Sequence, residues 1–203
     1  VDPRKAGLAS RADHWLRVRP GTDAALALSL THVLIENGWY DADFVREWTN
    51  AADLVEGQTV WDLLAARCAE YPPDVAAGIT GIPADDIVAT ARTLWESRPV
   101  AFYTWSGLEQ HSGTTQTVRA INVLYALTGC LDVEGGNVLF EAVPANPIDG
   151  RELLTSSMPS AVGLEKRPLG PARFGFVTGE DLYDAALDRR ITALMAFGGN
   201  LVM

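Results

Sequence analysis

The order of hydrophobic and polar positions along the chain predicts helices that alternate with a few buried strands. The clearest helix begins at Thr22 or Asp23, residue types that favour helix N-termini, and ends at Asn37-Gly38, which tolerate left-handed backbone. Its apolar face repeats at helical spacing through Leu26, Leu30, Val33 and Leu34. Further helical patterns cover residues 41–49, 60–70, 83–98, 114–127 and 180–187.

Two apolar runs predict buried strands: residues 100–105, directly after Pro99, and residues 191–197. Nearly all-apolar strands that alternate with helices are typical of a parallel sheet covered on both faces. The sequence therefore predicts an α/β fold, an open, mostly parallel, Rossmann-like sheet with helices on both faces. We expect residues 1–203 to be a piece of one such domain, incomplete at both termini, with a loop-rich excursion at about 141–178.

Composition narrows the function classes. A chain of 203 residues with 48% hydrophobic content can bury one substantial core. Sixteen basic against 26 acidic residues give a net charge of −10, so the basic footprint of a nucleic-acid-binding protein is missing. No apolar stretch approaches the ~20 residues of a membrane span, and we expect no direct membrane insertion. Cys68 and Cys130 lie far apart without metal-ligand spacing, which favours two buried thiols.

Polar turns carry the candidate chemistry. Three of them, residues 2–4, 106–111 and 198–200, follow apolar segments and would share the carboxyl edge of a parallel sheet, where such folds bind ligands. A fourth, residues 20–23, begins a helix whose free N–H groups suit an anion or a polar ligand. Each turn alone is ordinary loop chemistry, but four on one edge indicate a dinucleotide-binding crevice. His14 and His32 lack partners and receive no role.

Eight short motifs in order resemble one family, the molybdopterin-dependent oxidoreductases of the dimethyl sulfoxide reductase type. They are Val1-Asp-Pro-Arg, Ala12-Asp, Arg19-Pro-Gly-Thr-Asp-Ala-Ala-Leu, Thr80-Gly-Ile-Pro, Gly107-Leu-Glu-Gln-His, Leu127-Thr-Gly, Gly135-Gly-Asn and Gly198-Gly-Asn. The resemblance implies the central dinucleotide-binding-like domain, which holds one of two molybdopterin guanine dinucleotides attached to molybdenum or tungsten. It places the [4Fe-4S] cysteines and the protein ligand to the metal upstream of Val1, so we assign no catalytic residue and no metal ligand here.

The resemblance also implies cofactor-binding residues, carried over by position. One group would lie beside the nucleotide: Asp2, Pro3 and Arg4. A second would recognise guanine, because a carboxylate accepts two parallel bonds from its N1–H and amino group: Gly21, Thr22 and Asp23. A third would face the pterin or the phosphates: Ser106, Gly107, Gln110 and His111. Gly199 and Asn200 match a motif that contacts the cofactor.

The expected partners are the remaining domains of the parent chain and an iron–sulfur electron-transfer subunit. Residues 138–141 lack the Arg-Gly-Gln segment of formate dehydrogenases, which argues against formate as substrate. The motifs are more similar to the branch with thiosulfate and polysulfide reductases, acetylene hydratase and a transhydroxylase.

Two alternative functions stay open. An NAD-type domain is disfavoured by the absence of Gly-x-Gly-x-x-Gly between a strand and a helix, and a docking or scaffold module would use the acidic surface as an interface.

Overall fold

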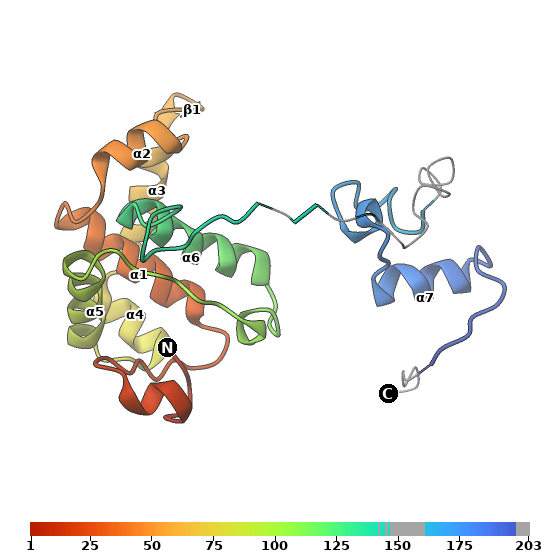
Figure 1. The fold of residues 1–203 in the computed structure, drawn as a ribbon, viewed down its shortest axis with the longest axis horizontal. Helices are drawn as coiled ribbons and strands as arrows, with labels where there is room; N and C mark the ends of the chain where they lie inside the picture. The colour runs from red at the N-terminus through yellow and green to blue at the C-terminus, as the bar shows by residue number, and fades with distance from the viewer. Residues whose placement is uncertain (142, 145, 147–160, 198–203) are drawn as a thin grey trace. The chain divides into compact units, whose positions relative to one another are not determined.

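The computed structural model describes residues 1–141, 143, 144, 146 and 161–197. The chain divides into two compact units, residues 1–141 and 142–203, which are described separately below (Figure 1).

The N-terminal unit is a helical assembly around one central helix, α1 (Figure 1). Its α-helices are α1 (Asp23–Glu36), α2 (Ala42–Trp48), α3 (Val60–Ala69), α4 (Pro73–Thr80), α5 (Ala84–Glu96) and α6 (Thr114–Thr128). Helix α1 contacts α3, α4, α5 and α6. Its predicted apolar face is the middle of the core, with Leu26, Leu30, Val33 and Leu34 all at most 5% exposed.

Local chemistry explains where these helices begin and end. The side chain of Asp41 caps α2 by accepting from the Phe44 N–H at 2.9 Å, and Thr59 caps α3 in the same way through the Asp62 N–H. Gly129, with φ of +63°, ends α6 in the left-handed region that favours glycine. Thr22 is the N-cap residue of α1, but its hydroxyl donates to the Arg19 carbonyl and caps nothing. Helix α4 lies in a segment to which the sequence analysis assigns no element.

The predicted open parallel sheet does not appear among the described residues. Their only sheet is an antiparallel hairpin of β1 (Leu54–Val55) and β2 (Gln58–Thr59), joined by Glu56-Gly57. Residues 100–105 and 191–197 are not paired as strands, so the structure does not show the two predicted strands. The physical reason is that a strand exists only through hydrogen bonds to a neighbour, which an apolar run does not specify. The described fold is mostly helical.

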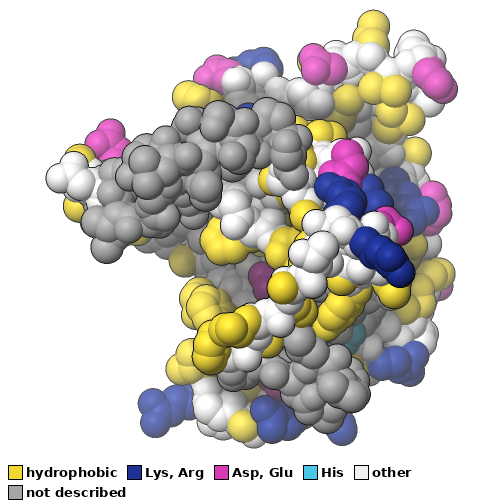
Figure 2. All heavy atoms as spheres, turned by 90° about the vertical axis from the view of Figure 1, so that its right-hand side faces the viewer, with side chains coloured by type: hydrophobic (Ala, Val, Ile, Leu, Met, Phe, Trp, Pro, Cys, Tyr) yellow, Lys and Arg dark blue, Asp and Glu magenta, His cyan; other side chains and the backbone are white. Residues whose placement is uncertain are grey.

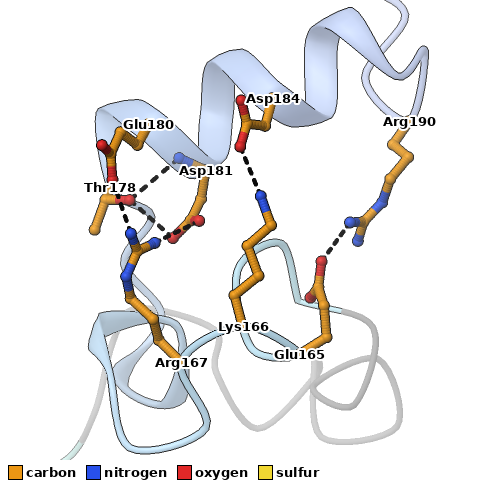
Figure 3. Close-up of polar contacts among 8 residues, drawn as sticks. All are labelled: Glu165, Lys166, Arg167, Thr178, Glu180, Asp181, Asp184 and Arg190. Atoms are coloured by element: carbon orange, nitrogen blue, oxygen red, sulfur yellow. Dashed lines mark hydrogen bonds and ion pairs between the residues drawn. The ribbon is translucent and has the colours of Figure 1, made fainter.

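The C-terminal unit centres on α7 (Gly179–Leu187), whose acidic residues hold the loop at 165–167 (Figure 3). Arg167 pairs with Asp181 at 2.5 Å and with Glu180 at 2.8 Å, and Lys166 pairs with Asp184 at 2.6 Å. Glu165 pairs with Arg190 just beyond the helix. Figure 2 shows exposed hydrophobic side chains next to acidic and basic groups on the face that it presents. In this unit such exposed side chains include Leu169, Phe174, Phe176 and Leu187.

None of the helices found in the described ranges is both long and apolar enough to cross a membrane.

Candidate functional site

A groove of about 870 Å³ opens on the N-terminal unit. Its volume falls within the range of roughly 300–1,000 Å³ typical of small-molecule and cofactor sites. The floor is apolar and comes from α1, α5, α6 and the extended segment before residue 106: Leu26, Leu30, Leu94, Phe102, Ile121 and Leu124. Polar residues of three turns line the rest: Asp2, Arg4, Asp23, Ser106, Gln110 and His111. An apolar floor with a few convergent polar groups is the usual composition of a ligand site.

The first turn is fixed by hydrogen bonds to its backbone groups. Asp2 donates its N–H to the Leu16 carbonyl at 3.1 Å, and its carbonyl accepts from the indole N–H of Trp15 at 2.9 Å. The Asp2 carboxylate accepts from the Arg4 N–H at 2.7 Å, closing a tight turn around Pro3. These contacts place the turn at the groove and leave the Arg4 side chain exposed.

The second turn joins the start of α1 to the groove. Arg19 anchors it, because its N–H donates to the Thr80 carbonyl and its guanidinium to the Ile79 carbonyl, both at 2.8 Å. Gly21 has φ of +84°, which a residue with a side chain adopts only with strain. A Cβ atom at that position would lie 3.4 Å from Nδ1 of His111, so the imidazole packs directly against this glycine. The second and third turns therefore touch.

The third turn follows the extended segment at residues 100–105. The Trp105 carbonyl accepts from the Leu108 N–H at 3.1 Å, which starts a short 3-10 helix at Ser106–Leu108. A Cβ atom built on Gly107 would have no atom within 4 Å, so a ligand can approach the backbone on that side. Tyr103 and Trp105 also line the groove, with their rings stacked at a centroid distance of 6.0 Å.

A second glycine-rich loop holds that extended segment in place. The Asn137 side chain accepts from the Phe102 N–H at 2.7 Å and donates to the Phe102 carbonyl at 2.8 Å, as a neighbouring strand would. Gly136 packs on the Cys130 carbonyl so closely that a Cβ atom would overlap it. Gly135, with φ of +82°, lies against Pro99. The Gly-Gly-Asn motif therefore positions residues 100–105.

The structure brings most of the predicted site residues to this groove. Eight of the twelve line it: Asp2, Pro3, Arg4, Asp23, Ser106, Gly107, Gln110 and His111. Gly21 and Thr22 lie in the same turn as Asp23, and Gly21 contacts His111. Gly199 and Asn200 lie outside the described residues. Their roles toward a cofactor remain predictions. Within the described ranges, no group of three or more His, Cys, Asp or Glu residues is placed to hold a metal ion.

The sequence analysis does not identify three residues of this region as site residues: Tyr103, Trp105 and Asn137. Asn137 stands out only as part of a motif, because its pairing with Phe102 depends on a contact across 35 positions. The apolar run at 100–105 predicts Tyr103 and Trp105 as parts of a buried strand. Tyr103 and Trp105 stand two positions apart, and side chains at that spacing lie on the same side of an extended segment. This spacing, directly before a polar turn, is the signal that could have identified them.

Comparisons with known proteins identify the family. The family model described as "Molybdopterin oxidoreductase" matches residues 1–197. A sulfite dehydrogenase subunit of Allochromatium vinosum is 28% identical, in an alignment covering 67% of this chain and 23% of that protein. Dimethyl sulfoxide reductase DmsA of Escherichia coli strain K12 is 31% identical, covering 68% of this chain and 18% of that protein. The chain thus spans about a fifth of the length of these relatives.

The solved structure of acetylene hydratase from Pelobacter acetylenicus is similar over 81% of this chain and 22% of its own length, with a TM-score of 0.63 and 28% identity. The chain belongs to the molybdopterin oxidoreductase family, in the division of dimethyl sulfoxide reductase.

Proposed function

We propose that this chain is the part of a molybdenum or tungsten oxidoreductase that holds the guanine dinucleotide portion of a bis-molybdopterin guanine dinucleotide cofactor. One observation carries the proposal: three turns far apart in sequence line a single groove, in which Asp23 begins α1 and His111 packs against Gly21. Family membership supplies the cofactor class, and the groove supplies a place for its nucleotide.

The groups present fit a guanine nucleotide. The Asp23 carboxylate can accept from N1–H and the amino group of guanine together, whereas adenine presents no such pair of donors. Gly21 and Gly107 keep the backbone accessible to a flat or phosphorylated ligand. Arg4 and His111 add a cation and an imidazole that can donate to phosphate oxygens. Bound there, the cofactor would supply the redox chemistry of its metal, while the chain orients it.

The parent protein would supply the parts of the enzyme that this chain lacks. We propose that its other domains contribute the metal ligand and a [4Fe-4S] cluster, and that it works with an iron–sulfur electron-transfer subunit. We further propose that residues 100–105 and 191–197 become strands of an open parallel sheet there. Their large apolar side chains support this, since Tyr103, Met195 and Phe197 are each at least 79% exposed in the described structure.

An isosteric substitution of Asp23, which removes its negative charge, tests the guanine site in this chain. Asp23→Asn loses the paired acceptor, and a hydrogen bond to a charged group contributes about 1.5–3 kcal/mol. Isothermal calorimetry should show a Kd for GDP raised roughly 10- to 150-fold, with the Kd for ADP nearly unchanged. Asp2→Asn, in the same groove, should weaken GDP and ADP alike, and Asp13→Asn, which does not line the groove, should change neither. Equal losses of GDP and ADP affinity in Asp23→Asn would remove the guanine role.

The cofactor itself is tested on the intact parent protein. Mass spectrometry should find molybdenum or tungsten, and acid treatment should release about two GMP per metal atom together with oxidised pterin. A folded, natively matured parent with neither metal nor GMP would refute the proposed function and favour a scaffold role.

A further inference from the structure

An exposed apolar surface lies at one end of the N-terminal unit, where α2 is followed by the hairpin of β1 and β2 (Figure 1). Its apolar side chains are Trp48, Leu54 and Val55, which are 76%, 70% and 48% exposed. Together with Asp53 and Glu56 they are called the hairpin surface below. None of the five is among the residues that line the groove. Large apolar side chains that gather in the open usually mark a site of protein contact.

The hairpin surface stands on a fixed base. Strands β1 and β2 are paired with each other, so each has its neighbour. The Asp53 carbonyl accepts from the Val60 N–H at 2.9 Å, and the Ala51 carbonyl accepts from the Trp61 N–H at 3.0 Å. The Trp61 ring packs on Tyr40 at a centroid distance of 4.8 Å, and both rings pack against the core. The exposed side chains are therefore presented by a formed element.

The charge around the hairpin surface is acidic. Residues 41–63 contain one basic residue, Arg46, and six acidic ones: Asp41, Asp43, Glu47, Asp53, Glu56 and Asp62. Arg46 pairs with Asp43 at 2.7 Å and with Glu47 at 3.0 Å. Asp53 and Glu56 form no ion pair with any residue that the structure describes. A protein that covers the apolar side chains must therefore bring positive charge to these two carboxylates.

Glu56 is not the residue that its backbone favours. It has φ of +52°, and Gly57 beside it has φ of +85°. Two central residues with positive φ are typical of the tight hairpin turn in which Asn-Gly is the preferred pair. Asparagine tolerates this left-handed backbone, whereas a longer side chain adopts it with strain. A carboxylate that the turn does not need, at the tip of an exposed hairpin, indicates a contact with another molecule.

We propose that the hairpin surface binds a separate protein whose contact face combines apolar side chains with basic ones, lysines among them. Trp48 supplies the apolar anchor, since tryptophan is a residue type that carries much of the binding energy at protein interfaces. Asp53 and Glu56 orient the partner through its positive charge and speed its association. A second copy of this chain does not fit, because a two-fold contact through this surface would bring the same carboxylates together. The surface is independent of the groove and of the function proposed for it.

Zero-length cross-linking identifies the occupant on the intact parent protein, isolated at low ionic strength from the cells that make it. A carbodiimide joins carboxylates to lysines in direct contact. Mass spectrometry should find Asp53 or Glu56 linked to lysines of a second, different polypeptide that is present in a fixed ratio to the parent. Links only to lysines of the parent, in the same copy or in another, would overturn the proposal. So would the absence of any link from these two carboxylates.

Substitutions then measure the contact between the parent and the linked polypeptide. Trp48→Ala should raise the Kd by about 30-fold, as expected for the loss of an aromatic anchor. Glu56→Lys should raise the Kd by about tenfold at low salt, and this difference should shrink as salt screens the charges. Asp74→Lys is the matched control, because it makes the same charge reversal at an exposed position of α4 outside the hairpin surface; its Kd should stay within about twofold of wild type.

Glu56→Asn separates a binding role of this carboxylate from a structural one. Asparagine suits the turn, so the unfolding temperature of this chain should rise by roughly 1–4 °C. The Kd for the linked polypeptide should nevertheless increase several-fold, because the charge is lost. A lowered unfolding temperature with an unchanged Kd would mean that Glu56 serves the hairpin alone and would overturn the proposal. Wild-type affinity in Trp48→Ala would overturn it as well. Neither result touches the guanine test on Asp23.

Discussion

Asn137 offers the sharpest test of how the groove is built. Its side chain makes two hydrogen bonds to the backbone of Phe102, at 2.7 and 2.8 Å, in a partly buried position. Each such bond contributes a net of about 0.5–1.5 kcal/mol. Asn137→Ala should therefore lower the free energy of unfolding by about 1–3 kcal/mol, and the unfolding temperature by roughly 2–12 °C.

Hydrogen exchange gives the more specific readout. The Phe102 amide should exchange faster in Asn137→Ala than in the wild type, while amides in the middle of α1 change only with global stability. Asn137→Asp should destabilise at least as much, because it puts a carboxylate oxygen against the Phe102 carbonyl oxygen. Asn122→Ala on the exposed surface of α6 is the control and should stay within about 0.5 kcal/mol of wild type. If Asn137→Ala behaves like Asn122→Ala and Phe102 exchange is unchanged, the strand-like pairing is not what holds residues 100–105.

Three further predictions concern the glycines at 136 and 78, the titration of Asp181 and the reactivity of Cys68. Gly136→Ala forces a methyl group onto a backbone carbonyl and should cost about 1–3 kcal/mol in urea unfolding, whereas Gly78→Ala, which faces open space within α4, should stabilise by about 0.5–1 kcal/mol. The hydrogen bond from Thr178, aided by a neighbouring guanidinium, lowers the pKa of Asp181. The stability it contributes is present above the unfolded-state pKa of about 3.9 and should disappear as pH falls through the lower folded-state value. NMR of α7 below pH 4 should show this loss. Asp181→Asn should remove the part that Asp181 contributes and leave the smaller part of Glu165, whose pKa is also lowered. Burial raises the pKa of the Cys68 thiol to about 11, so alkylation by iodoacetamide at pH 8 should be slow until the protein unfolds.

The helices could be predicted because their signals are local. The apolar face of residues 23–37 recurs at helical spacing, and the structure turns that same face into the core around α1. Helix α4 is not among the predicted helices, although proline suits the first turn of a helix and Pro73 stands there. Predicting residues 100–105 as a strand requires a neighbouring strand, whereas in the structure the side chains of Asn137 and Cys130 bond to the backbone of this segment.

The site shows the same difference between local sequence signals, which can be recognised, and long-range contacts, which cannot. The turns at 2–4, 20–23 and 106–111 are visible in sequence because glycine, proline and aspartate mark them locally, and the structure brings all three to one groove. The loop at 135–137 shapes that groove from outside it, through contacts that no spacing reveals. If Asn137 fixes Phe102, and the segment at 100–105 leads directly into the 106–111 turn, then loss of the Asn137 amide should also weaken ligand binding. Asn137→Ala should therefore raise the Kd for GDP even though Asn137 does not line the groove, whereas a ligand held by Asp23 and Arg4 alone would bind with unchanged affinity.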